Sequence, residues 1–150
     1  MVPMSVEEIA KAVDGRLIGD ADSESRATNT VSDSRQAGPG SVFVAIRGER
    51  VDGHDFVAKT AEQGATVAIV DHEVESDGLP QIVVKDTVDA LGELARHNIV
   101  RRRELDGDFD IIGLTGSVGK TTTKDLLSSL LATVGPTVAP VGSFNNEIGL

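Results

Sequence analysis

The stretch FDIIGLTGSVGKTTTKDLLSSLLA, residues 109–132, decides the fold of the second part of this chain. It opens with an apolar run that predicts a buried strand, and it closes with a run that favours a helix. The loop between them contains Gly116, Gly119 and the pair Lys120 and Thr121. Glycines permit a tight curl whose backbone N–H groups, with the positive end of the helix dipole, face one cluster of phosphate oxygens. The stretch therefore predicts a phosphate-binding loop.

One position departs from the usual pattern G-x-x-x-x-G-K-[ST], because Leu114 stands where the first glycine is expected. Leu114 ends the predicted strand at 109–114, and a residue with a side chain fits there if its φ is negative. Lys120 would reach the β- and γ-phosphates, and the Thr121 hydroxyl would bind Mg²⁺, so we predict catalytic roles for both. The predicted nucleotide-binding residues of this loop are Gly116, Ser117, Val118, Gly119, Lys120, Thr121 and Thr122.

Upstream of this loop, helical and strand-like patterns alternate, which predicts an α/β fold. Ser5 and Glu8 form an S-x-x-E capping box, so a helix should start after Ser5. The continuous apolar runs TVAIVD and PQIVVKD are typical of strands buried on both faces of a parallel sheet. The strands are expected at 16–19, 28–35, 41–46, 66–71, 80–86, 109–114 and 137–141, and further helices at 56–63, 86–105 and 119–133.

Asp106-Gly107-Asp108 has the composition of a linker, which predicts one domain over residues 1–106 and the start of another over 107–150. The second segment holds only a strand, a loop, a helix and a strand. Such a βαβ unit is too small to bury both faces of a sheet, so we expect this domain to be incomplete.

Composition excludes several classes of protein. The net charge of −10 argues against general nucleic-acid binding, which needs a basic surface. The absence of cysteine excludes disulfides, thiolate zinc sites and thiol catalysis. No apolar run approaches the ~20 residues of a membrane span, and the first residues lack the order of a secretory signal. We therefore expect a cytoplasmic protein.

The loop sequence T-G-S-V-G-K-T resembles that of the Mur ligase and folylpolyglutamate synthase superfamily. These enzymes use ATP to activate a carboxylate as an acyl phosphate, which an amine then attacks. DSRQAGPGSVFVAIRGERVDGHDF (33–56) is similar to the N-terminal domain of Mur ligases that take UDP-N-acetylmuramoyl peptides. TGSVGKTTTKD (115–125) and GSFNNEIGL (142–150) resemble the branch of the family that adds D-alanyl-D-alanine.

The resemblance implies a substrate domain at 1–106 and, at 107–150, the truncated first βαβ unit of a P-loop ATPase domain. It implies ATP and Mg²⁺ as cofactors, UDP-MurNAc-tripeptide and D-Ala-D-Ala as substrates, and a monomer. Asn145 and Asn146 would donate to ATP or to the acyl phosphate, although paired asparagines are also common turn residues.

Two upstream loops are candidates for the UDP end of the substrate. Arg35 could donate to a diphosphate or to a uracil carbonyl, and a second loop that starts at Arg47 could close on the same nucleotide. The alternative is plain turn chemistry, since Asp-Ser-Arg suits a capped turn and Asp-Gly is a turn signal. The candidate substrate residues are Ser34, Arg35, Arg47, Gly48, Asp52, Gly53 and His54.

His72 and His97 have no second metal ligand at a suitable spacing, so we interpret both as structural, and Asp71-His72-Glu73 as a solvated turn. Three alternative functions remain open. The chain could belong to the diamino-acid-adding Mur ligase, or it could act alone as a non-catalytic UDP-sugar-binding domain. It could also be a P-loop switch protein, which would bind guanine nucleotide and no UDP-sugar. We expect the 150-residue chain by itself to be catalytically inactive.

Overall fold

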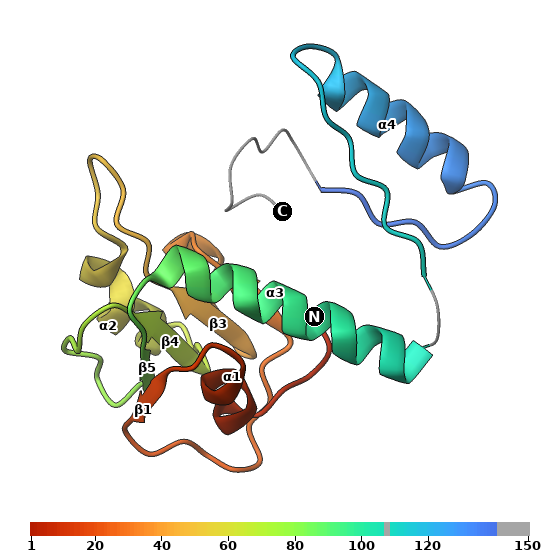
Figure 1. The fold of residues 1–150 in the computed structure, drawn as a ribbon. Coiled ribbons are helices and arrows are strands. Elements are labelled where there is room, and N and C mark those ends of the chain that lie inside the picture. Colours follow the sequence, from red (N-terminus) through yellow and green to blue (C-terminus); the bar gives the residue numbers. More distant parts are fainter. Residues whose placement is uncertain (107–108, 141–150) are drawn as a thin grey trace. The chain divides into compact units, whose positions relative to one another are not determined.

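The computed structural model describes residues 1–106 and 109–140 (Figure 1). The chain divides into two compact units, residues 1–107 and 108–150, and each is described by itself. The predicted residues Asn145 and Asn146 lie outside the described residues.

The first unit contains one mixed sheet in the order β1-β5-β4-β3-β2. Its strands are β1 (Arg16–Ile18), β2 (Asn29–Val31), β3 (Ser41–Val44), β4 (Val67–Val70) and β5 (Gln81–Val83). The four strands from β2 to β5 are parallel, with Val42 opposite Val67 and Ile69 opposite Ile82. Strand β1 joins the β5 edge in the antiparallel direction, with Leu17 opposite Ile82. The parallel sheet that the apolar runs predicted is confirmed.

Helices cover both faces of this sheet. They are α1 (Val6–Ala12), α2 (Val57–Glu62) and α3 (Thr87–Asp106), with short 3-10 turns η1 (Ser34–Gln36) and η2 (Gly53–Phe56). Helices α1 and α3 contribute Ile9 and Leu94 to the core on one face, and α2 contributes Val57 to the core on the other (Figure 1).

The strands divide their side chains between the two cores because successive residues point to opposite faces. In β3, Val42 and Val44 join the α1 and α3 side, whereas Phe43 joins the α2 side. All four residues of β3 and of β4 are buried, and all of them except Ser41 are apolar, which is why these strands do not alternate between apolar and polar residues.

Local sequence fixes where the helices start. The Ser5 hydroxyl accepts from Glu8 N–H, and the Glu8 carboxylate accepts from Ser5 N–H, so the predicted capping box is confirmed. At α3, the Asp86 carboxylate accepts from the N–H groups of Val88 (2.8 Å) and Asp89 (2.9 Å). The helix predicted over 86–105 is therefore found within one residue of its expected ends.

The second unit contains one described helix, α4 (Lys120–Leu131). The buried strand predicted at 109–114 is wrong, because those residues pair with no strand in the described part of the chain, and Ile111 and Ile112 are more than half exposed. The strand predicted at 137–141 is not formed over its described residues, 137–140. A strand requires neighbours that take up its backbone hydrogen bonds, and the described part of this unit offers none.

Candidate functional site

The parallel strands bring the predicted substrate residues to one edge of the first sheet. Ser34 and Arg35 follow β2, the loop from Arg47 to His54 follows β3, and Asp71 follows β4. Because β2, β3 and β4 are parallel, the residues that follow them gather at the carboxyl edge. Open α/β sheets bind ligands at this edge. The candidate substrate site therefore lies at the carboxyl ends of β2, β3 and β4.

The loop after β3 projects from this edge as a narrow hairpin (Figure 1). Its base is closed by a bridge between Arg47 and Asp52, and Gly48 N–H donates to the Val51 carbonyl at 2.9 Å. Gly53 N–H donates to the Ile46 carbonyl at 2.9 Å, and a Cβ on Gly53 would lie 2.6 Å from Ile46 N. Glycine is therefore required at position 53 by the close approach of two backbone segments.

His54 lies under this loop and is buried, with 6% of its surface exposed. Its Nδ1 is 2.6 Å from Asp52 Oδ1, and its Nε2 accepts the backbone N–H of Asp71 at 3.0 Å. Because Nε2 accepts, the ring proton of the neutral imidazole is on Nδ1, from which it donates to Asp52. His54 thus joins the loop after β3 to the turn after β4. Asp52 caps η2 through the backbone N–H of His54.

Arg47 is held by two carboxylates. Its Nε donates to Asp52 Oδ2 at 2.9 Å, and its Nη2 forms an ion pair with Asp71 Oδ2 at 3.5 Å. The hydrogen bond that Arg47 donates to Asp52, together with the charges of Asp71 and Asp52, raises the pKa of Arg47. The Asp52 pKa lies far below its usual range, chiefly because Asp52 accepts the backbone N–H of His54 and also bonds the His54 ring. The Arg47 side chain remains 60% exposed, so its guanidinium can still reach a ligand.

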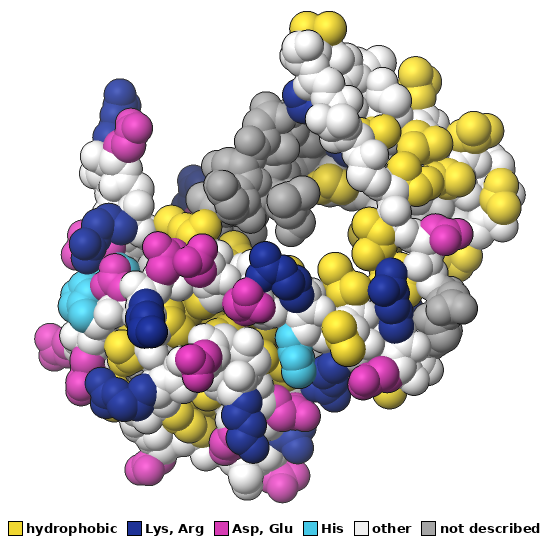
Figure 2. Space-filling view, viewed as in Figure 1, with side chains coloured by type: hydrophobic (Ala, Val, Ile, Leu, Met, Phe, Trp, Pro, Cys, Tyr) yellow, Lys and Arg dark blue, Asp and Glu magenta, His cyan; other side chains and the backbone are white. Residues whose placement is uncertain are grey.

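The turn after β4 makes more side-chain contacts than the sequence predicted. The His72 ring stacks on His54 with centroids 4.6 Å apart, and its Nδ1 bonds Asp71 Oδ1. The interpretation of Asp71-His72-Glu73 as a solvated turn agrees with the exposure of His72 and Glu73, but it missed the contacts of Asp71 and His72 with His54. The available signal was position, because Asp71 directly follows a buried parallel strand. In Figure 2, histidine lies among acidic and basic side chains at the base of the projecting loop.

Ligand atoms of His54, Asp71 and His72 lie within 4.8 Å of one another, which is close enough to consider a metal ion. Both ring nitrogens of His54 are already engaged. A metal on its Nε2 would leave the Asp71 N–H without its acceptor, and the nearby Arg47 adds a repelling charge. These residues therefore do not fit a metal site in this arrangement.

Ser34 and Arg35 form the short turn η1 at the same edge. The Asp33 carboxylate caps this turn through Arg35 N–H at 3.0 Å and also binds the Arg35 guanidinium through Nε and Nη2. The Arg35 hydrogen bonds lower the Asp33 pKa to about 2. The Arg35 side chain is 82% exposed, so it can act as an anion donor only through the edge that Asp33 leaves uncovered.

The predicted phosphate loop precedes α4 in the second unit. Gly116 has φ +150° and Gly119 has φ +79°, so both adopt backbone that favours glycine. Outside glycine, positive φ occurs in the described residues only at Asp14 and Asp77, so Leu114 has the ordinary backbone that we expected. Lys120 Nζ donates to the Gly116 carbonyl at 2.5 Å, which places the ammonium inside the curl.

The candidate nucleotide residues therefore occupy the start of a 12-residue helix that no side chain caps. Ser117, Val118, Thr121 and Thr122 are all exposed around this start. Free N–H groups at a helix start and a nearby ammonium suit an oxyanion, and a threonine hydroxyl suits Mg²⁺. These residues fit a nucleotide with its metal ion.

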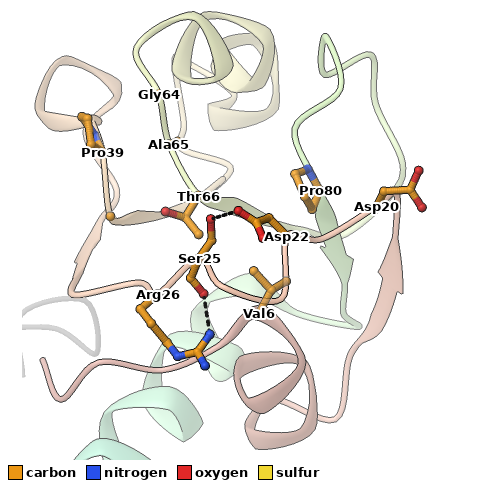
Figure 3. Close-up of a pocket in the computed structure, with 11 residues that line it drawn as sticks. Val6, Asp20, Asp22, Ser25, Arg26, Pro39, Gly64, Ala65, Thr66 and Pro80 are labelled. Carbon is orange, nitrogen blue, oxygen red and sulfur yellow. Dashed lines mark hydrogen bonds between the residues drawn. The ribbon is translucent and has the colours of Figure 1, made fainter.

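A separate pocket of about 350 Å³ lies at the opposite, amino edge of the sheet (Figure 3). It is lined by the residues just before β3, β4 and β5 and by the loop around Asp22. Asp22 accepts from the Ser25 hydroxyl, and Arg26 Nη1 donates to the carbonyls of Ser23 and Ser25. Asp22 and Arg26 already have partners, so this pocket is a weaker candidate than the carboxyl edge. None of the helices over the described residues has the length and apolarity that a bilayer crossing needs.

Comparison with known proteins gives a consistent result. The profile of the "Mur ligase family, catalytic domain" matches residues 27–99. Over 172 residues the chain is 37% identical to the UDP-N-acetylmuramoyl-tripeptide–D-alanyl-D-alanine ligase of Mycobacterium tuberculosis (strain H37Rv), covering 99% of this chain and 33% of that protein. Identity to the enzyme of the same name from Escherichia coli K12 is 37%, covering 100% of this chain and 31% of that protein.

Solved structures agree with these relatives. MurF from Acinetobacter baumannii superimposes with a TM-score of 0.83 at 38% identity, covering 98% of this chain and 31% of that one. MurF ligase from Thermotoga maritima, solved in complex with ADP, superimposes with a TM-score of 0.68 at 35% identity, covering 82% of this chain and 27% of that one. The chain thus spans about a third of the length of the proteins that it matches.

Proposed function

We propose, from the premise that this chain belongs to the Mur ligase family, that it forms the substrate-binding domain and the start of the ATP-binding domain of a D-alanyl-D-alanine-adding ligase. The terminal carboxylate of UDP-MurNAc-tripeptide would attack the γ-phosphate of ATP, which gives an acyl phosphate and ADP. The amine of D-Ala-D-Ala would then attack the acyl carbon and release phosphate. The names of the relatives favour this activity over diamino-acid addition.

The sugar nucleotide is assigned to the carboxyl edge of the first sheet. The observation that carries this assignment is the convergence of Ser34, Arg35 and Arg47 at the ends of neighbouring parallel strands. Arg47 presents an exposed cation, and Gly48 gives the loop a tight turn. Gly53, Asp52 and His54 would act by holding the loop, since Gly53 and His54 are buried and Asp52 is engaged by Arg47.

ATP is assigned to the loop before α4. The backbone amides of Gly116 to Thr122 would hold its phosphates, Lys120 would offset their charge, and Thr121 would bind Mg²⁺. A bound Mg²⁺ supplies positive charge where two anions must approach each other. Support comes from the positive φ of Gly116 and Gly119 and from the relative solved with ADP. Asn145 and Asn146 remain part of the proposal as donors to ATP.

Two further properties belong to this proposal. The 150-residue chain alone should bind ligands but not ligate them, because it spans about a third of its relatives. A cytoplasmic location is proposed because the chain uses no cysteine and its substrate is expected to be activated with ATP. The monomer that the family resemblance implies remains part of the proposal.

Calorimetric titration with UDP-MurNAc-tripeptide and, separately, with ATP and Mg²⁺ tests the proposal, with two variants that serve as controls for each other. Arg47→Ala should lower the affinity for UDP-MurNAc-tripeptide about 10-fold and leave the affinity for ATP unchanged, because a charge-assisted hydrogen bond contributes about 1.5–3 kcal/mol. Lys120→Ala should lower the affinity for ATP and leave the affinity for UDP-MurNAc-tripeptide unchanged. Binding of GTP in preference to ATP, with no affinity for the UDP-sugar, would instead favour a P-loop switch protein.

A further inference from the structure

We infer that Asp71, in the turn after β4, is a positioning residue that presents Arg47 to the diphosphate of the sugar nucleotide. This inference rests on the proposed function, because it assigns a supporting residue to the same site. Sequence patterns single out Arg47, Asp52 and His54, whereas Asp71 lies outside those motifs. Asp71 joins them only through the fold.

The four residues form a closed network, which we call the Arg47 network. Asp52 binds Arg47 through Oδ2 and His54 through Oδ1. His54 accepts the backbone N–H of Asp71, and the Asp71 carboxylate returns to Arg47 through Oδ2 at 3.5 Å. Each member is therefore held from two sides.

The network fixes a side chain that would otherwise be mobile. An arginine has about 2 kcal/mol of rotamer entropy, and a guanidinium held by one carboxylate can still rotate away from a ligand. Asp52 engages Nε and Asp71 engages Nη2, so two separate contacts set the plane of the guanidinium. Its Nη1 has no partner among the described residues and remains available to an anion. This arrangement suits one oxygen of a diphosphate.

Asp71 also places a negative charge near a proposed anion site, so the direction in which anion affinity changes when Asp71 is removed tests the inference. If Asp71 acted only through its charge, its removal would strengthen anion binding. If it acts by positioning Arg47, its removal weakens anion binding. The two roles predict opposite changes.

The experiment measures UDP affinity by calorimetry in chains that all carry Lys120→Ala, so that the phosphate loop does not contribute. In this background Asp71→Asn should lower the affinity for UDP about fivefold, which corresponds to a typical coupling free energy between residues in contact. Combined with Arg47→Ala, the same change should alter the affinity less than twofold, because Asp71 acts through Arg47. Glu73→Gln removes the same charge from the same turn and is the matched control, expected to change the affinity less than twofold.

A second variant guards against misfolding of Asp71→Asn, which circular dichroism would detect. Arg47→Lys keeps the charge but cannot bridge two carboxylates, so it should lower the affinity for UDP at least fivefold. If the Lys120→Ala chain does not bind UDP at all, the proposed function fails. If it binds UDP and Asp71→Asn binds equally well or more tightly, the inference fails and the proposed function stands. If Asp71→Asn lowered the affinity for UDP equally in chains with Arg47 and in chains with Arg47→Ala, the inference would also be overturned.

Discussion

Replacement of Gly53 by alanine tests whether the loop after β3 depends on close backbone packing. A Cβ at position 53 would lie 2.6 Å from Ile46 N, 2.8 Å from Ile46 O and 3.0 Å from Ala45 C. All three are backbone atoms of the segment that leaves β3, so no side-chain rotation can relieve the overlap. The backbone must move, and the hydrogen bond from Gly53 N–H to Ile46 O must lengthen or break.

The expected cost follows from these two effects. Forcing an extra carbon into a packed site costs about 1–3 kcal/mol, and loss of one hydrogen bond adds about 1 kcal/mol. We therefore expect Gly53→Ala to lower the free energy of unfolding of the first unit by about 2–4 kcal/mol. This is a large part of the ~5–15 kcal/mol that stabilises an ordinary domain.

Urea unfolding followed by far-ultraviolet circular dichroism measures this change, because the chain has no tryptophan or tyrosine for fluorescence. Gly92→Ala is the matched control, since Gly92 lies inside α3 and a Cβ there would meet only the end of the Arg96 side chain at 4.0 Å. It should stabilise by about 0.5–1 kcal/mol, as alanine is the better helix former. A Gly53→Ala change below about 0.5 kcal/mol, the usual range of neutral substitutions, would refute the steric reasoning.

Two further predictions concern stability. Ser5→Ala removes half of the capping box of α1 and should lower the free energy of unfolding by about 1 kcal/mol in the same urea assay, whereas Ser23→Ala in an exposed loop should have little effect. Acid should destabilise the first unit through Asp52, whose lowered pKa gives a contribution that is present above the ordinary carboxyl pKa of about 4 and is lost progressively below it. The urea concentration at the unfolding midpoint, measured from pH 7 to pH 2, should decrease as the pH drops through this acidic range, and it should decrease less steeply for Asp52→Asn. Equal slopes of midpoint against pH in the two proteins would contradict the assignment.

Most elements of the first unit were predictable because local signals and tertiary packing agree there. The runs at 66–71 and 80–86 each contain an uninterrupted apolar centre, VAIV and IVV, and each forms a strand covered on both faces. The capping box at Ser5 set a helix start that depends on the next few residues alone. In both cases the decisive interactions lie close in sequence or are imposed by burial.

The rest depended on contacts that sequence does not specify. Nothing in Asp71 or His72 indicates that His54 lies beneath them, since the residues meet only when β3 and β4 pair. The sequence motif at Arg35 did not show that Asp33 would occupy part of its guanidinium. The apolar run at 109–114 resembles the other strands, yet without neighbouring strands among the described residues it stays unpaired.

The antiparallel edge strand has a consequence for synthesis of this protein on the ribosome. Strand β1 can pair only after β5 has been made, and α1 can complete its packing only when α3 has emerged. The first helix must therefore wait for nearly the whole first unit before Ile9 is covered. Nascent chains arrested before Leu94 should expose this apolar surface and recruit chaperones, whereas chains arrested well beyond α3 should resist protease.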